Sequence, residues 1–222
     1  MVTSDDDPQH YFEAAPTSRS DRSTVELVLP DLNLTLATDS GVFGRRKVDP
    51  GTKLLLLDGP APSDGDHNLL DIGAGYGPIA LTLAARNPEA TVWAVEVNSR
   101  ARELCRDNAA TAGLTNVRVV EPDSVPPTVT FDRIWSNPPI RIGKAALQGL
   151  LERWLSRLTD GGTAHLVVQK HLGSDSLHRW LDNRGFATTR RASRAGYRLL
   201  DVAARVEPSG SAAAPSTTEE RS

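Results

Sequence analysis

The stretch Leu69–Ala84, "LLDIGAGYGPIALTLA", decides the fold of this 222-residue chain. Its first four residues, Leu69–Ile72, are mostly apolar and predict a short buried strand, and Ile79–Arg86 has the apolar spacing of a helix. Between them, three glycines at alternate positions allow a sharp turn and the close approach of a ligand. A strand, a glycine turn and a helix in this order are typical of an open α/β sheet, which binds ligands at the carboxyl ends of its strands.

Strands and helices alternate along the rest of the chain, which predicts a parallel sheet with helices on both faces and an antiparallel final pair of strands. The fold class is therefore α/β, with a Rossmann-like seven-stranded sheet. Its further predicted strands are Thr91–Val97, Val117–Glu121, Phe131–Ser136, Thr163–Gln169, Phe186–Ala192 and Tyr197–Val206. The further predicted helices are Arg100–Ala112, Lys144–Leu158 and Leu177–Arg184.

The catalytic-type domain is expected to span residues 67–206, preceded in residues 11–66 by smaller elements. Apolar and polar residues alternate around Pro30-Asp31, which predicts a β-hairpin of Val25–Leu29 and Leu32–Ala37. A short helix is expected to begin near Asp49-Pro50, because Asp caps helices and Pro suits the first turn. Residues 1–10 and 207–222 are polar and without periodicity, so both ends are predicted to be disordered.

The composition is that of a soluble globular protein, with 39% hydrophobic residues and a net charge of −3. No apolar run approaches the roughly 20 residues that cross a bilayer, and the acidic start lacks the apolar region of a signal peptide. A single cysteine, Cys105, excludes an internal disulfide and favours a reducing cytoplasm. Between Arg133 and Arg198 the net charge is +8, which suggests either a polyanionic partner or an Arg-rich solvated face.

The glycine loop and the acids around it predict the cofactor. Glu96 ends the next strand, 21 residues after Gly75, where a carboxylate can accept hydrogen bonds from both ribose hydroxyls of an adenosine. Pro78 stands where the dinucleotide fingerprint has its last glycine, and no Lys-Ser/Thr pair follows at the spacing of a P-loop. Asp71 would repel a pyrophosphate but suits a ligand with an ammonium group, such as S-adenosylmethionine. Asp123 follows the third strand and could accept the adenine amino group, with Glu121 or Ser124 as alternatives.

The strand Phe131–Ser136 runs directly into Asn137-Pro138-Pro139. Prolines have no N–H to donate, so the sheet ladder ends there. Asn137 offers an amide oxygen, and we expect the carbonyl of Pro138 to be free outside the ladder. Two rigidly held acceptors suit a planar –NH2 group, whose lone pair they would direct at an electrophile by orientation and preorganised electrostatics. The motif thus predicts methyl transfer to an amino nitrogen.

Together, Asp71–Gly77, Glu96 and Asn137–Pro139 resemble the class I S-adenosylmethionine-dependent methyltransferases that modify exocyclic or amide nitrogens. The upstream stretch "GVFGRRKVDPGTKLLLL", Gly41–Leu57, is similar to the segment before the cofactor loop in the small-subunit ribosomal RNA guanine-N2 methyltransferases. The resemblance covers residues 25–205. It implies S-adenosyl-L-methionine as cofactor, ribosomal RNA or the 30S subunit as partner, and the N2 amino group of a 16S ribosomal RNA guanine as acceptor.

The resemblance also implies roles for individual residues. Catalysis would fall to Asn137, Pro138 and Pro139. The implied cofactor contacts are Asp71, Gly73, Ala74, Gly75, Glu96, Val97, Asp123 and Asn137. The implied substrate contacts are Ile140, Arg141, Lys144 and Phe43. No metal is expected, because the histidines at 165, 171 and 178 are dispersed over a strand and a loop–helix region.

Two features depart from the family pattern. Ile140 stands where the family usually has an aromatic that stacks on the acceptor base, and Phe43, Tyr11 or Phe12 could supply the missing ring. The longer members carry an additional N-terminal domain of similar fold, whereas about 65 residues precede the glycine loop here. Three other functions stay open: protein glutamine methylation of the release-factor type, DNA adenine methylation, and RNA binding by an inactive methyltransferase-like protein.

Overall fold

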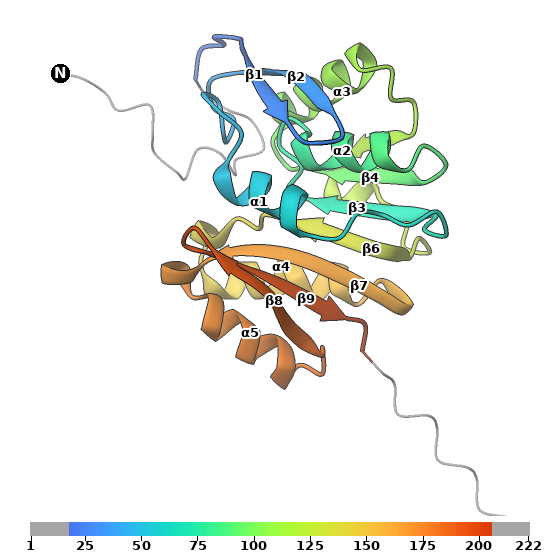
Figure 1. Ribbon diagram of the computed structural model, residues 1–222, viewed down its shortest axis with the longest axis vertical. Helices are drawn as coiled ribbons and strands as arrows, with labels where there is room; N and C mark the ends of the chain where they lie inside the picture. The colour runs from blue at the N-terminus through green and yellow to red at the C-terminus, as the bar shows by residue number, and fades with distance from the viewer. Residues whose placement is uncertain (1–17, 206–222) are drawn as a thin grey trace, which may run out of the picture.

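The computed structural model describes residues 18–205, which form an α/β domain around a seven-stranded sheet (Figure 1). The strand order is β5-β4-β3-β6-β7-β9-β8, and β9 pairs antiparallel with both of its neighbours. These are β3 (Asn68–Ile72), β4 (Thr91–Val95), β5 (Val117–Val120), β6 (Phe131–Ser136), β7 (Leu158–Gln169), β8 (Thr188–Arg194) and β9 (Tyr197–Ala203). The predicted fold class is confirmed, while the predicted disordered ends lie outside the described residues.

Five helices and three short 3-10 turns connect the strands. The helices are α1 (Pro50–Asp58), α2 (Pro78–Arg86), α3 (Ser99–Thr111), α4 (Lys144–Leu155) and α5 (Ser174–Asn183). The turns are η2 (Pro122–Ser124), η3 (Ile140–Ile142) and η4 (Lys170–Leu172). Two further strands, β1 (Ser23–Val28) and β2 (Asn33–Thr38), form the predicted hairpin as a separate antiparallel sheet.

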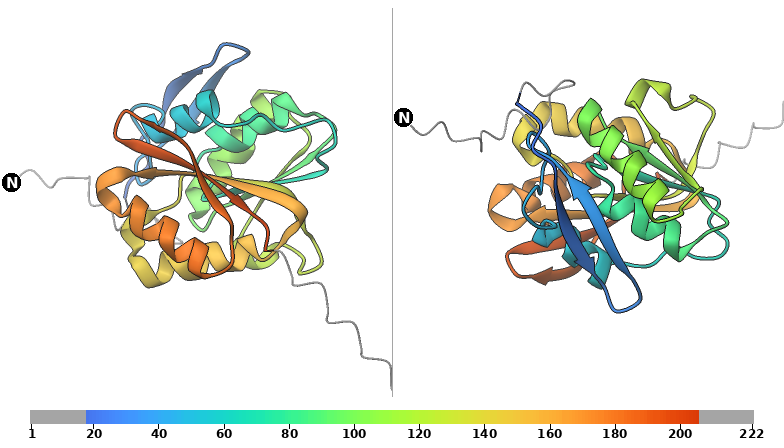
Figure 2. Two further views of the ribbon diagram at one scale, coloured as in Figure 1. Left: turned by 60° about the horizontal axis from the view of Figure 1, so that its bottom comes forward. Right: turned by 90° about the horizontal axis from the view of Figure 1, so that it is seen from above.

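The sheet is buried on both faces, which explains its almost continuous apolar strands. Successive residues of β3 point to opposite sides: Leu69 packs with α1, α2 and α3, whereas Leu70 packs with α4 and α5. Figure 2 shows the sheet between these two layers of helices. Trp135 on β6 belongs to the first layer, as a core residue.

The order of the strands places a ligand site at the carboxyl end of β3. The chain passes from β3 outward through β4 to β5, then crosses back to β6 on the other side of β3. At such a reversal the connections leave in opposite directions, so a crevice forms outside the carboxyl ends of the strands. The glycine loop after β3 and the segment after β6 therefore meet there.

The hairpin β1–β2 lies outside the main sheet and is fixed to α3 and α2 (Figure 2). Asn108 of α3 accepts from the N–H of Ala37 at 2.7 Å and donates to its carbonyl at 2.9 Å, as a neighbouring strand would. Arg86 at the end of α2 holds Asp31 in the hairpin turn at 2.7 Å. The hairpin is therefore a fixed part of the domain.

The structure corrects the predicted boundaries around α4 and β7. Helix α4 ends at Leu155, three residues before the predicted end at Leu158, and β7 already begins at Leu158. The strand then carries Gly161 and Gly162 through an irregularity in its register with β6. A Cβ on Gly162 would lie 2.9 Å from the carbonyl oxygen of Thr159, so these glycines permit a tight bulge rather than stopping a helix.

The last strands also shift. Strand β8 covers Thr188–Arg194 rather than Phe186–Ala192, and β9 ends at Ala203, short of the predicted Val206, which is outside the described residues. Helix α5 begins three residues earlier than predicted, at Ser174.

Within residues 18–205, no helix has the length and apolar character needed to span a membrane.

Candidate active site

The glycine loop joins β3 to α2, and its three glycines serve two different purposes. Gly73, Gly75 and Gly77 all have positive φ angles, of 74°, 57° and 100°, which L side chains rarely adopt. A Cβ on Gly73 or Gly75 would meet no atom within 4 Å, so these two face open space. A Cβ on Gly77 would lie 2.8 Å from the sulfur of Cys105, so Gly77 serves the packing of α2 on α3.

Asp71, the first acid of the loop, is fully buried in β3. Its Oδ2 accepts from the N–H of Ala80 in α2 at 3.0 Å, whereas its Oδ1 has no partner among the described residues. Burial raises the pKa of Asp71 to about 8, the N–H of Ala80 opposes the shift, and the nearby charge of Glu96 adds to it. A buried carboxyl with an unsatisfied oxygen below an open glycine loop suits a cation, as the ammonium of S-adenosylmethionine is.

Glu96 follows β4 and joins the two loops that would hold an adenosine. Its Oε2 accepts from the N–H of Gly75 at 2.9 Å, and its Oε1 accepts from the N–H of Asn98 at 2.8 Å. Burial raises the pKa of Glu96, although these backbone donors counter that shift. Each carboxylate oxygen has a further lone pair, so Glu96 can still accept from ribose hydroxyls. Val97, beside it, is 39% exposed at this edge.

Asn137 lies level with the glycine loop. Asp71 on β3 is in register with Trp135 on β6, so two residues further along each strand bring Gly73 and Asn137 side by side. Ser136 strengthens this junction, because its hydroxyl donates to the carbonyl of Ile72 at 2.8 Å. The two motifs that the sequence separates by more than 60 residues thus form one site.

The carbonyl of Pro138 is not free, contrary to the expectation from the sequence. Pro138 is buried, and its carbonyl accepts from the N–H of Ile140 at 2.8 Å. Pro139, between them, has φ −73° and ψ 77°, the conformation of an inverse γ-turn. The chain therefore folds back on Pro138 as soon as the ladder ends, which leaves this oxygen one lone pair for another donor.

The amide nitrogen of Asn137 has two partners that sequence reasoning missed. Its Nδ2 donates to Oδ1 of Asp49 at 2.7 Å and to Oγ1 of Thr52 at 3.0 Å. Both residues lie at the start of α1, and Asp49 also caps that helix by accepting from the N–H groups of Gly51 and Thr52. The only signal in the sequence was the predicted cap at Asp49, which carried no hint of Asn137.

The segment before α1, residues 41–49, lies along the glycine loop. Gly41 accepts from Nδ2 of Asn98 at 3.1 Å, and Gly44 accepts from the hydroxyl of Tyr76 at 3.4 Å. Phe43, one of the three aromatic candidates, is 47% exposed within this segment. Tyr11 and Phe12, the other aromatic candidates, lie outside the described residues.

The predicted substrate residues follow the γ-turn. Ile140 is half-buried and packs against the layer of α4 and α5, while Arg141 and Lys144 are exposed. Asp123, the predicted adenine contact, is 91% exposed and pairs with Arg153 at 2.8 Å. Glu121, one of its alternatives, pairs with Arg102. The assignment of the adenine contact remains a prediction.

Tertiary ion pairs neutralise much of the basic segment 133–198. Six of its twelve basic residues pair with acids, four of which lie outside the segment. The pairs are Arg133–Asp66, Arg153–Asp123, Arg184–Glu152, Arg191–Asp201, Arg194–Asp58 and Arg198–Asp175. The charge of +8 therefore overstates the positive field of this region.

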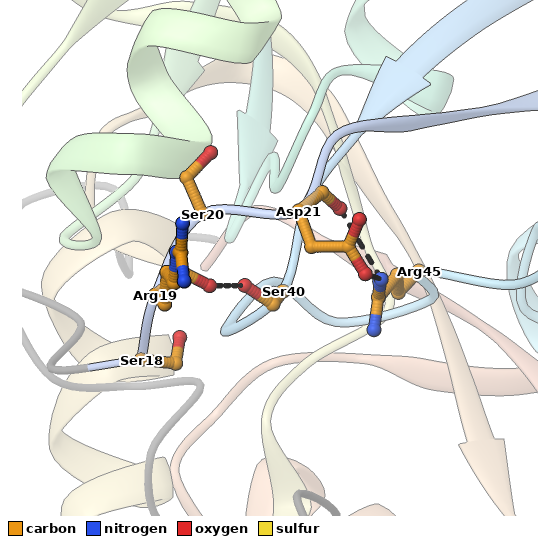
Figure 3. Close-up of a pocket in the computed structure, with 6 residues that line it drawn as sticks. All are labelled: Ser18, Arg19, Ser20, Asp21, Ser40 and Arg45. Atoms are coloured by element: carbon orange, nitrogen blue, oxygen red, sulfur yellow. Dashed lines mark hydrogen bonds and ion pairs between the residues drawn. The ribbon is translucent and has the colours of Figure 1, made fainter.

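A polar pocket lies beside the segment before α1, where residues 18–21 run along Ser40 and Arg45 (Figure 3). Its groups satisfy one another: Ser40 donates to the carbonyl of Arg19, and Arg45 pairs with Asp21. Arg100 of α3 also donates to the carbonyl of Ser40 at 2.7 Å. This pocket supports the turn that precedes Phe43 and presents no group suited to catalysis.

The fold and the site define a class of enzyme. A Rossmann-like sheet with Asp-x-Gly-x-Gly-x-Gly after its first strand, an acid after the second and Asn-Pro-Pro after the fourth is a class I S-adenosylmethionine-dependent methyltransferase. The chain belongs to the methyltransferase small domain family, whose model matches residues 33–201. S-adenosyl-L-methionine is its cofactor, and the orphaned Asp71 oxygen and the open glycine loop fit that group.

Known proteins support this assignment. An uncharacterized protein, YbxB of Bacillus subtilis, is 36% identical over 76% of this chain and 85% of its own length. Ribosomal RNA small subunit methyltransferase C of Shewanella halifaxensis is 32% identical over 72% of this chain and 48% of its own. The structure of the Thermus thermophilus 16S rRNA N2 G1207 methyltransferase (RsmC) with AdoMet and guanosine matches with a TM-score of 0.72 and 26% identity, over 83% of this chain and 51% of that one. The chain thus spans about half the length of these RsmC relatives.

Proposed function

We propose that the protein methylates the exocyclic N2 amino group of a guanine in 16S ribosomal RNA. The observation that carries the proposal is the orientation of Asn137, whose nitrogen is held by Asp49 and Thr52 while its oxygen is left to accept. An amino group needs acceptors and no donors, so this amide presents the correct atom to it. The similarity to the 16S rRNA N2 G1207 methyltransferase favours guanine N2 as the acceptor.

Each residue of the site has a part in this reaction. Asp71, Gly73 to Gly75, Glu96 and Val97 would hold the cofactor, which supplies the methyl group when bound. The Oδ1 of Asn137 and the remaining lone pair of the Pro138 carbonyl would hold the two hydrogens of the acceptor amino group. This arrangement turns the nitrogen lone pair out of conjugation and toward the methyl group, so it lowers the barrier by orientation and requires no general base of shifted pKa.

The distribution of unpaired cations supports RNA as the substrate. Within residues 18–205, Arg141 and Lys144 after β6, and Lys170 after β7, form no ion pair. Because β6 and β7 are parallel, the segments that carry these residues leave the sheet at the same edge. Arg46 and Lys47, also without an ion pair there, precede Asp49, which contacts Asn137. Cations left unneutralised around the acceptor site are suited to the phosphates that flank an extruded base.

The apolar wall of the acceptor pocket would come from Ile140, helped by Phe43. An aromatic that stacks on a base contributes about 1–3 kcal/mol to affinity. We therefore expect Phe43→Ala to weaken substrate binding, and unchanged substrate affinity in this variant would exclude Phe43 from the role.

The test is methylation with tritiated S-adenosylmethionine. The substrates are stripped 30S subunits, free ribosomal RNA, tRNA and release factor, with Asn137→Ala as control. Label in 16S RNA that digests to N2-methylguanosine, and that Asn137→Ala loses, is the expected result. Label in protein alone would overturn the RNA assignment, and cofactor binding without any transfer would favour a binding protein that has kept the fold.

Two matched double variants test the cation assignment. Arg141→Ala with Lys144→Ala removes two exposed cations at the site, and Arg179→Ala with Arg190→Ala removes two exposed unpaired cations from α5 and β8. Each phosphate contact contributes about 0.7–0.9 to the slope of log K against log salt concentration. The first pair should reduce that slope by about 1–2 and the second should leave it unchanged. Equal effects would indicate a diffuse field instead of a phosphate contact at the site.

A further inference from the structure

We propose that Asp49 and Thr52 are positioning residues of the methyl transfer, which orient and polarise the amide of Asn137. The inference rests on the proposed function, in which Asn137 holds the acceptor amino group. It adds two residues from another element that hold Asn137 itself. Asn137 follows β6, whereas Asp49 and Thr52 belong to the start of α1, 88 and 85 residues earlier in the chain. No residue of α1 is otherwise part of the cofactor loop or of the Asn-Pro-Pro motif.

The partners decide which way the amide faces. The oxygen and nitrogen of an Asn side chain have nearly the same shape, and rotation about the last side-chain torsion is soft. A carboxylate only accepts, so the group 2.7 Å from Asp49 must be the NH2 group of Asn137. A rotation by 180° would place two oxygens in contact at Asp49. The Thr52 hydroxyl, 3.0 Å away, can accept or donate, and it accepts the second hydrogen of the NH2 group that Asp49 orients. Without these partners the amide could present its NH2 group to an amino substrate, where two donors would face each other.

The positioning group is itself rigid. Oδ1 of Asp49 also accepts from the backbone N–H groups of Gly51 at 2.8 Å and Thr52 at 3.1 Å, so the helix cap fixes its position. Gly51 brings the helix close to β9, since a Cβ there would lie 2.7 Å from the ring of Tyr197. Leu54–Leu56 anchor the next turn in the core. A small shift of α1 would therefore move the amide of Asn137.

Besides orienting the amide of Asn137, Asp49 polarises it through its negative charge. The acceptor nitrogen would become positive as its bond to the methyl carbon forms and the bond from that carbon to sulfur breaks, with the electron pair of the broken bond left on sulfur, and the nitrogen would then lose a proton to water. A carboxylate that accepts from Nδ2 draws electron density toward Oδ1, because hydrogen bonds in series polarise one another. Hydrogen bonds from Asn137 to the half-buried carboxylate of Asp49, and from the acceptor amino group to Asn137, thus place a negative charge in line with the developing positive charge.

The experiment separates orientation from general damage to α1. Asp49→Ser keeps a capping residue but is too short to reach Asn137, and Thr52→Val keeps the shape but removes the acceptor. Thr52→Ser restores the hydroxyl, and Lys53→Gly weakens the same helix from its exposed face without contacting Asn137. Three quantities are measured for each variant: kcat with the RNA substrate that the protein methylates, the Kd for S-adenosylmethionine, and the Tm.

We expect kcat to fall by about 10²-fold in Asp49→Ser and Thr52→Val, with cofactor Kd within about twofold of wild type, because misplacement near the reacting atoms has effects of that size. Thr52→Ser should recover most of kcat, and Lys53→Gly should lower Tm while keeping kcat. Retained kcat in both Asp49→Ser and Thr52→Val, when Asn137→Ala is inactive, would overturn the inference and leave the proposed function intact.

A readout without substrate keeps the two questions apart. The side-chain NH2 signals of Asn137 can be assigned in a ¹⁵N-correlated NMR spectrum by their absence in Asn137→Ala. They should move in Asp49→Ser and Thr52→Val and stay in Lys53→Gly. Unmoved signals contradict the contact itself, whereas moved signals in a protein without N2-guanine activity would point to failure of the proposed function alone.

Discussion

The buried carboxyl of Asp71 should make the cofactor-free protein less stable as the pH rises. Burial raises the pKa of Asp71 from 3.8 to about 8 in the folded protein. The folded state therefore keeps a proton that the unfolded chain releases above about pH 4. The contribution of this group to the free energy of unfolding is complete below the unfolded pKa and is lost progressively as the pH rises to about 8.

The magnitude follows from the linkage relation. Each pH unit within this window costs about 1.4 kcal/mol, so between pH 5 and pH 7 the loss is about 3 kcal/mol. Asp71→Asn keeps an oxygen for the N–H of Ala80 and has no such linkage. The difference in Tm between this variant and the wild type should thus change by about 6–12 °C in favour of the variant over these two pH units.

The assay is thermal and urea unfolding at pH 5, 6 and 7 without cofactor. Asp107→Asn removes the charge of an exposed aspartate on α3, which pairs with Arg22, and so controls for the loss of one negative charge. Calorimetry at pH 7 in buffers of different ionisation enthalpy adds a second measurement: cofactor binding should release about one proton as Asp71 ionises against the ammonium group, and Asp71→Asn should bind at least about tenfold more weakly. Parallel pH profiles for the wild type and Asp71→Asn would refute the reasoning.

Two further predictions concern the packing around the cofactor loop. Gly77→Ala, with φ 100° and its new Cβ 2.8 Å from the sulfur of Cys105, should lower the free energy of unfolding by about 2 kcal/mol or more. Gly113→Ala, with φ 70° and no atom within 4 Å, should lower it by about 1 kcal/mol from backbone strain alone. Equal losses of urea midpoint in the two variants would contradict the role assigned to the contact of Gly77 with Cys105. Asn108→Ala removes the donors to the carbonyls of Ala37 and Tyr76, both at 2.9 Å. The variant should lose about 1–3 kcal/mol of unfolding free energy and bind the cofactor more weakly. An unchanged cofactor Kd would show that the attachment of the hairpin to α3 does not support the glycine loop.

The order of elements could be predicted because local patterns carry it. Apolar runs flanked by glycine or proline mark strands that are buried on both faces, and these patterns do not depend on distant residues. The same holds for the open glycines of the cofactor loop, whose positive φ angles follow from the residue type. Chain order in such a sheet then brings Asp71, Glu96 and Asn137 to the carboxyl edge.

Where local signals conflict, the prediction failed at the boundaries. Gly161 and Gly162 indicated a helix stop, yet they lie inside β7, because the strand bulges against β6. The carbonyl of Pro138 was expected to be free, yet the γ-turn at Pro139 returns the N–H of Ile140 to it. In both cases a contact of the folded chain decided how a flexible local sequence is used.

The sequence by itself determined the Rossmann-like class, the cofactor loop and the acceptor motif of this methyltransferase, since each is encoded by residue type and short spacing. Only the tertiary structure decided which atom of Asn137 faces the acceptor, because Asp49 is 88 positions away and reaches it through the packing of α1. Only the structure decided which cations stay unpaired, because the acids that neutralise the basic segment come from distant elements. Side-chain partners at long range depend on strand register and helix packing, and no local pattern records them.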